Sequence, residues 1–125
     1  MIVQIAHLFA TGCLAIIFFQ IALIAGAPLG AYTQGGQREG ALPLTGRIIA
    51  AVSIPILGFC GLALLSAAGF AEGFWPRWTG WAAMGVISLS CLANWITPSA
   101  RERAVWGPVM LVMTAMALYV MVLTA

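Results

Sequence analysis

The chain has 125 residues, of which 63% are hydrophobic and 6% are charged, and its five basic and three acidic side chains leave a formal net charge of +2. A soluble domain carries roughly 25% charged residues, so the composition excludes a water-soluble fold. The small positive charge also argues against nucleic acid as a partner, because nucleic-acid binding needs a basic patch of many Lys and Arg side chains.

Four long apolar segments use nearly the whole chain. We expect transmembrane helices at about residues 2–25, 47–70, 78–96 and 100–123, since about 20 apolar residues cross the hydrocarbon core of a bilayer. The sequence therefore predicts an all-α polytopic membrane protein, a single domain over residues 1–125 in which four transmembrane helices form an antiparallel bundle. The first segment lacks a basic leading stretch, so we expect it to be retained and not removed as a signal peptide.

Glycine, proline and serine residues mark the ends and the bends of these helices. Gly26 and the proline that follows it end the first helix, because glycine accepts the left-handed cap conformation. Pro55 and Pro108 lie inside the second and fourth helices, where each removes a backbone hydrogen bond and is expected to cause a kink. Ser99 and Glu102 form a capping-box pattern, in which each side chain accepts a hydrogen bond from the backbone N–H of the other.

The placement of the arginines predicts the orientation of the bundle. Arg77 lies alone on one side of the membrane, whereas the first and third connections hold Arg38, Arg47, Arg101 and Arg103. Cytoplasmic loops carry the excess of positive charge. These two connections are therefore expected in the cytoplasm, and both chain termini are expected outside.

The same two connections hold the most suggestive group of charged side chains, beside a loop rich in glycine. Arginines at a membrane surface attract anionic lipid headgroups, worth about 1 kcal/mol each, although they also serve simply to set the topology. The candidate cytoplasmic interaction surface comprises Arg38, Glu39, Arg47, Arg101, Glu102 and Arg103.

Few polar side chains lie within the expected helices, and His7, Gln20 and Asn94 are the candidate intramembrane polar sites. A histidine can relay a proton, but near a helix end it also reaches interfacial water or bonds to a neighbouring helix. Ser90 lies one turn before Asn94 on the same face, where the two bond between helices or contact a pore or a headgroup. The cysteines have no CxxC spacing, and no catalytic residue, metal site or cofactor is expected.

Two segments on the expected cytoplasmic side have a familiar pattern. The first reads GAPLG at residues 26–30, then GG at 35–36, LP at 42–43 and Arg47. The second reads NWITPS at residues 94–99, then ER at 102–103 and WGP at 106–108. Together they resemble a group of small bacterial four-helix membrane proteins. The resemblance covers most of the chain and implies a multi-pass protein of the bacterial inner (plasma) membrane, but it implies no activity, cofactor or catalytic residue.

The absence of catalytic groups favours a non-enzymatic module, an accessory or self-associating subunit of a membrane complex. Its expected partners are membrane lipids and either a larger membrane complex or further copies of itself. The alternative is a small channel or transporter for a neutral or anionic solute, with the helices kinked at Pro55 and Pro108 lining its path. A weaker alternative is a lipid-handling enzyme that uses His7.

Overall fold

The computed structural model of the chain describes residues 1–124. Its long helices are α1 (Ile2–Ile24), α2 (Leu44–Ala67), α3 (Arg77–Ile96) and α4 (Ala100–Leu123), and short 3-10 turns, η1 (Gly30–Tyr32), η2 (Gln34–Gly36) and η3 (Phe70–Glu72), lie in the connections. Each long helix has the length and apolar composition needed to cross a membrane. The prediction of an all-α bundle of four transmembrane helices is confirmed.

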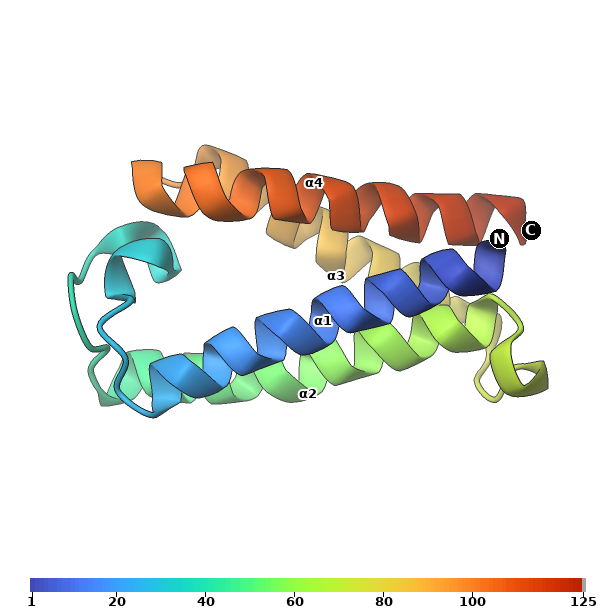
Figure 1. Cartoon of the computed structure of the whole chain (residues 1–125), viewed down its shortest axis with the longest axis horizontal. Helices are drawn as coiled ribbons and strands as arrows, with labels where there is room; N and C mark the ends of the chain where they lie inside the picture. Colours follow the sequence, from blue (N-terminus) through green and yellow to red (C-terminus); the bar gives the residue numbers. More distant parts are fainter. Residues whose placement is uncertain (125) are drawn as a thin grey trace.

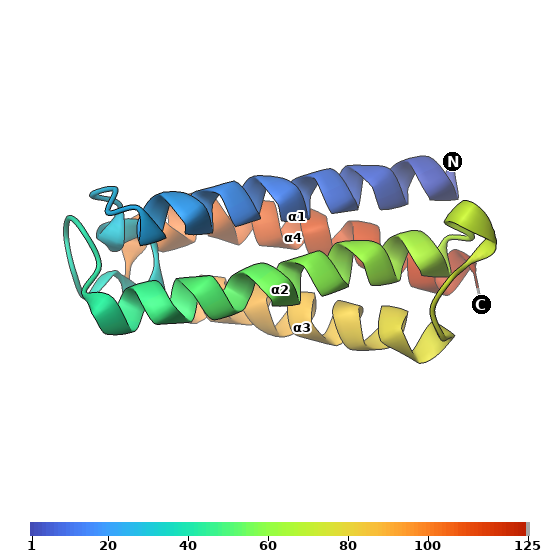
Figure 2. The same ribbon diagram turned by 90° about the horizontal axis from the view of Figure 1, so that it is seen from below.

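The helices run up and down in chain order, and each packs beside the next (Figures 1 and 2). α1 packs against both α2 and α4, and α3 completes the ring by packing against the same two helices. Both termini lie at one end, here called the terminal end (Figure 1). The long first loop, residues 25–43, lies at the opposite end with the short connection between α3 and α4. We call this the first-loop end.

The first loop is part of the bundle's end. In Figure 1, α1 and α2 slope away from α4 as they approach this loop, and the loop lies between the ends of the diverging helices. The hydroxyl of Ser99 donates to the carbonyl of Ala31 at 2.7 Å. The side-chain amide of Gln34 donates to the carbonyl of Gly46 in α2 at 2.9 Å. The loop is therefore bonded to both pairs of helices.

Glycine and proline set the ends of α1 and α2, as the sequence indicates. Gly26 has a φ of 97°, which a residue without a Cβ adopts freely, and its N–H bonds to the carbonyl of Leu23 at 3.1 Å. The predicted glycine cap of α1 is confirmed. Residues 44–67 form α2, earlier in the chain than the predicted 47–70, because Pro43 takes the N-cap position and the helix ends before the left-handed Gly69.

The capping box at the start of α4 forms only in part. The hydroxyl oxygen of Ser99 accepts from the N–H of Glu102 at 3.1 Å, as predicted. The N–H of Ser99 bonds to the hydroxyl of Thr97 at 3.2 Å, so the predicted return bond from the Glu102 side chain is wrong. The carboxyl group of Glu102 is therefore not bonded to the N-terminus of its own helix.

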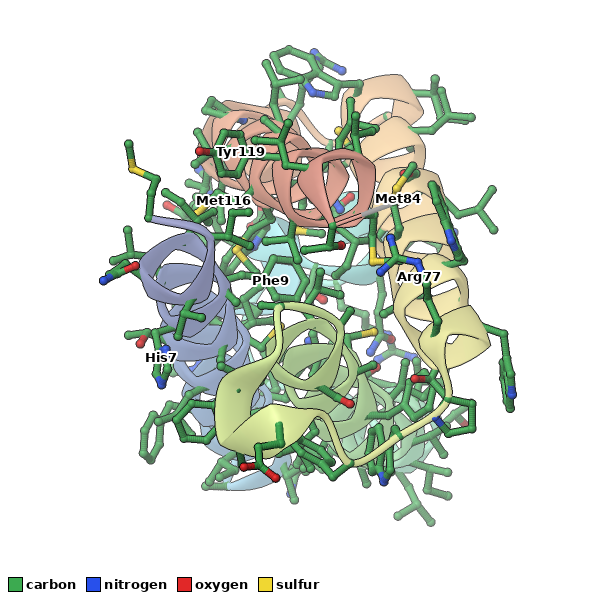
Figure 3. All side chains as sticks on the ribbon, turned by 90° about the vertical axis from the view of Figure 1, so that its right-hand side faces the viewer. His7, Phe9, Arg77, Met84, Met116 and Tyr119 are labelled. Carbon is green, nitrogen blue, oxygen red and sulfur yellow. The ribbon has the colours of Figure 1, made fainter. Side chains whose placement is uncertain are left out.

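A tight apolar core fills the terminal half of the bundle and continues past its middle. Figure 3, viewed from the terminal end, shows Phe9 pointing into the centre of the bundle. The largest fully buried side chains of this core are Phe9, Leu64, Ile87, Met121, Val120, Cys13 and Cys60. Leu23 is also fully buried, in a smaller separate cluster with Leu42 and Ala50 at the first-loop end. Glycine permits close helix contact here: a Cβ built on Gly80 of α3 would lie 2.7 Å from the sulfur of Met121 in α4. Small residues thus bring the helices together at this end.

Candidate functional site

A cavity of about 280 Å³ lies between the helices in the half of the bundle nearer the first loop. Every long helix and the first loop contribute to its wall. Most of the lining is apolar and aromatic, and the polar side chains are Gln20, Thr33, Ser53, Ser90, Asn94 and Glu102. An apolar cavity with a few convergent polar groups is the usual pattern of a small-molecule site.

Most of these polar side chains have no partner within residues 1–124. Ser53 donates to the carbonyl of Ile49, and the amide of Asn94 donates to the carbonyl of Ser90. The side chains of Gln20, Thr33, Ser90 and Glu102 make no hydrogen bond to this part of the chain. Their polar atoms are not sealed in the protein, because the one fully buried side-chain polar atom without a partner in residues 1–124 is the hydroxyl oxygen of Thr114. These four groups are therefore free to bond to water or to a solute in the cavity.

Glu102 has the most unusual environment of the lining residues. Only 8% of its surface is exposed. The neighbouring Arg103 donates to the carbonyl of Thr97 at 2.8 Å, and Arg101 points outward. Neither arginine forms an ion pair with Glu102, so a buried acidic side chain faces the cavity without a basic partner.

Helix geometry explains this burial. Glu102, Trp106 and Met110 follow one another at intervals of four residues, which places them on one face of α4, and all three line the cavity. Glu102 is therefore buried, although the sequence places it in the candidate cytoplasmic interaction surface, and its membership of that surface stays a prediction. Its charged sequence neighbours lie on other faces of the same helix.

The remaining members of the predicted interaction surface divide into two groups. Arg38, Glu39 and Arg101 are exposed at the first-loop end. Arg47 and Arg103 are half-buried and donate to backbone carbonyls of the connections, at 2.9 Å for Arg47 and 2.8 Å for Arg103. The first group stays a predicted contact surface, whereas the second stabilises the connections.

Two hollows adjoin the cavity at the first-loop end. One, of about 410 Å³, is formed by the first loop and the end of α3, and it shares Asn94 and Glu102 with the cavity. The other, of about 370 Å³, is formed by the first loop and α2 and shares Thr33. Asn94 and Glu102 thus lie between the interior of the bundle and its end.

Of the three predicted intramembrane polar sites, Gln20 and Asn94 line the cavity and His7 does not. His7 is exposed near the terminal end, on the outer side of α1 (Figure 3). Its Nδ1 lies 2.8 Å from the carbonyl oxygen of Val3, and its ring meets the ring of Phe70 edge to face at 4.8 Å. It has no contact with the polar groups of the cavity.

The predicted kink sites, Pro55 and Pro108, lie inside helices that continue past them. Both prolines are exposed, and the cavity is lined by their helix neighbours, Ile56 and Leu57 in α2 and Trp106 and Met110 in α4. The kinks themselves stay predictions.

Comparison with known proteins finds no matching family model, no similar curated protein and no similar solved structure. The resemblance to small bacterial four-helix membrane proteins stays a prediction. In the part of the chain that the structure describes, no cluster of three His, Cys, Asp or Glu side chains has an arrangement that could hold a metal ion. The cavity is therefore the feature from which a function can be argued.

Proposed function

We propose that this protein is a small membrane transporter that binds a small polar solute in the cavity between its helices. The observation that carries the proposal is the set of polar side chains that line the cavity, one or two from each long helix and one from the first loop, most of which make no hydrogen bond within the described chain. Polar groups inside a membrane bundle are expensive, and they commonly mark solute or ion pathways. A purely structural subunit has no need of them.

The shape of the interior supports a transporter over an open pore. Asn94 and Glu102 line both the cavity and a hollow at the first-loop end, which provides a route for the solute from that side. Toward the terminal end, the fully buried side chains of Phe9, Leu64 and Met121 occupy the space between the helices. For the solute to cross the terminal half of the bundle, the helices there must move apart.

The direction of access follows from the predicted orientation. With the first and third connections in the cytoplasm, as the excess of arginine at that end suggests, the cavity opens toward the cytoplasm. The sequence resemblance supports a place in the bacterial inner membrane. Labelling of single-cysteine variants in intact cells tests this orientation, starting from a chain in which the three native cysteines are replaced.

A second candidate is the accessory or self-associating subunit. Arg38, Glu39 and Arg101 favour it, because they are exposed at one end of the bundle and could contact a partner or lipid headgroups. Native mass spectrometry of protein extracted gently from its own membrane tests this candidate. Recovery within a larger assembly supports it, and recovery of the chain alone as a monomer contradicts it.

The transporter is tested by solute flux into vesicles of phosphatidylcholine and phosphatidylglycerol, with urea as a neutral probe and methylammonium as a cationic one. Ser90→Leu fills the cavity and removes a polar group, so we expect it to reduce flux to the level of empty vesicles. Gly85→Leu is the matched control on α3, because a Cβ at Gly85 meets open space. Wild-type flux equal to that of empty vesicles for both probes contradicts the proposal.

A further inference from the structure

We infer that the cavity selects a small ammonium-type cation, with the carboxyl group of Glu102 as its principal ligand. This inference rests on the proposed transport function and names its class of solute. Three features of the lining carry it: the isolated acidic side chain, the other oxygen atoms that line the same cavity, and an aromatic pair in its wall.

The charge of the lining favours a cation. Glu102 is the one charged residue among the lining residues of the cavity, and no arginine is among them. The carboxyl group of Glu102 has no ion pair and accepts no hydrogen bond within the described chain, and it borders both the cavity and the hollow at the first-loop end. A carboxylate in a mostly apolar lining is stabilised by an opposite charge or by several hydrogen bonds. A cation in the cavity provides an opposite charge, whereas an anion meets repulsion. Of the neutral or anionic solutes that the sequence suggests for a channel or transporter, the lining thus disfavours the anionic ones.

The other polar groups present oxygen atoms suited to N–H donors. Asn94 donates through its amide nitrogen to the carbonyl of Ser90, which leaves its amide oxygen as an acceptor. Ser53 donates its hydroxyl proton to Ile49, which leaves its oxygen lone pairs as acceptors. Gln20 and Thr33 add an amide oxygen and a hydroxyl oxygen. An alkylammonium ion has several N–H donors, and these acceptors match them.

An aromatic pair in the wall supports an organic cation. Phe19 of α1 and Trp106 of α4 both line the cavity, with ring centroids 4.7 Å apart and an interplanar angle of 60°. Trp106 lies one helical turn from Glu102 on the same face of α4. Aromatic faces attract ammonium groups, and tryptophan does so most strongly. The carboxyl group and the indole ring therefore provide adjacent contacts for the charge and the methyl groups of such an ion.

The first test compares methylammonium and urea fluxes in vesicles of phosphatidylglycerol alone, because the choline headgroup of phosphatidylcholine is itself an ammonium-type cation. Glu102→Gln keeps the shape of the side chain and removes its charge. We expect methylammonium flux to fall roughly thirtyfold or more, as for the loss of a buried charge partner, while urea flux persists. Glu39→Gln removes an exposed acidic side chain from the same end of the bundle and is expected to leave both fluxes unchanged.

The outcomes distinguish a failure of cation selection from a failure of the proposed transport function. Equal loss of both fluxes in Glu102→Gln, in a variant that retains wild-type thermal stability, overturns cation selection and leaves the transporter intact. No flux of either probe through the wild type contradicts the transporter itself.

Two further measurements decide between an organic and an inorganic cation. Trp106→Leu removes the indole face, and we expect it to reduce methylammonium flux without reducing urea flux. Wild-type potassium flux is expected to be much lower than methylammonium flux. Potassium flux equal to that of methylammonium, with no effect of Trp106→Leu on the ratio of methylammonium to urea flux, overturns the assignment to an ammonium-type cation.

Discussion

The two halves of the bundle differ in what fills the space between the helices. Near the terminal end, Phe9, Cys60, Leu64 and Met121 are fully buried and the helices approach closely. Near the first-loop end, the helix pairs diverge (Figure 1). Polar side chains line a cavity there. In lipid, apolar contact with a neighbouring helix gains little over contact with acyl chains, so close packing carries the stability. We therefore expect the close packing of the terminal half to contribute more to stability than the smaller buried cluster of Leu23, Leu42 and Ala50 at the first-loop end.

Each end of the bundle is also held by polar links of a different kind. At the terminal end, Arg77 of α3 donates to the carbonyl of Met121 at 2.7 Å and to the hydroxyl of Thr124 at 3.0 Å. At the first-loop end, the hydroxyl of Ser99 links the start of α4 to the carbonyl of Ala31. The first link joins two helices, and the second joins a helix to a loop that borders the cavity. Substitutions at the two ends are therefore expected to affect different properties.

The largest expected effect on stability comes from the core of the terminal half. Phe9→Ala removes a fully buried ring and leaves a void, and we expect a loss of about 3 kcal/mol in the free energy of unfolding. Reversible unfolding with sodium dodecyl sulfate in mixed micelles measures it. Phe18→Ala is the matched control, because Phe18 lies on the same helix with 62% of its surface exposed. Equal losses in the two variants would show that the terminal half does not hold the stabilising core.

A smaller and more local effect is expected at the first-loop end. Ser99→Ala removes both the helix cap to Glu102 and the bond to Ala31, together about 2 kcal/mol. Hydrogen exchange measures it, with faster exchange expected at residues 29–36 and at the start of α4. Thr11→Ala is the control, because the Thr11 hydroxyl bonds only to the carbonyl one turn earlier in its own helix. Unchanged exchange in Ser99→Ala would show that the loop is held by other contacts.

The link at the terminal end is expected to contribute less. Arg77→Gln removes charge-assisted hydrogen bonds to the carboxyl end of α4, where a cation also interacts favourably with the helix dipole. The side chain is partly exposed, so we expect a loss of about 1 kcal/mol in the free energy of unfolding. Arg101→Gln, at an exposed position, is expected to change it by less than about 0.5 kcal/mol. Similar losses of unfolding free energy in both variants would show that the hydrogen bonds of Arg77 to the end of α4 do not stabilise the bundle.

The fold was predictable from sequence because lipid permits few structures. Long apolar segments without charges must satisfy their backbone groups internally, and this requirement selects helices. The end of α1 at Gly26 was equally predictable, since the signal is local. The docking of the first loop was not, because the bond between Ser99 and Ala31 joins residues 68 positions apart. No local pattern indicates such a contact.

The candidate site was predictable only in part, and Glu102 shows why. Its place between Arg101 and Arg103 indicates a solvated surface, whereas its spacing from Trp106 and Met110 places it on the inner face of α4. The helical period is the stronger evidence and would have indicated burial. The sequence identifies Gln20 and Asn94 as polar residues in apolar helices, but their place in one cavity depends on how the helix pairs diverge. That divergence is set by packing across the whole bundle.

The smallest expected effect tests whether the terminal half takes part in function at all. His7 is exposed at the terminal end, where its ring nitrogen lies within hydrogen-bond distance of the Val3 carbonyl in the same helix and its ring contacts that of Phe70. His7→Ala is therefore expected to change the free energy of unfolding by less than about 0.5 kcal/mol. We also expect methylammonium flux at about pH 6 and at about pH 8 to stay at wild-type levels.

A flux in His7→Ala that lost its dependence on pH would place a proton-linked step at the terminal end. The assignment of transport to the cavity half alone would then be wrong. Unchanged flux at both pH values, together with the loss expected in Glu102→Gln, would exclude His7 as a proton relay for this transport. Transport would then depend on the cavity beside the first loop. The helices of the terminal half would stabilise the bundle and would move apart only while the solute crosses.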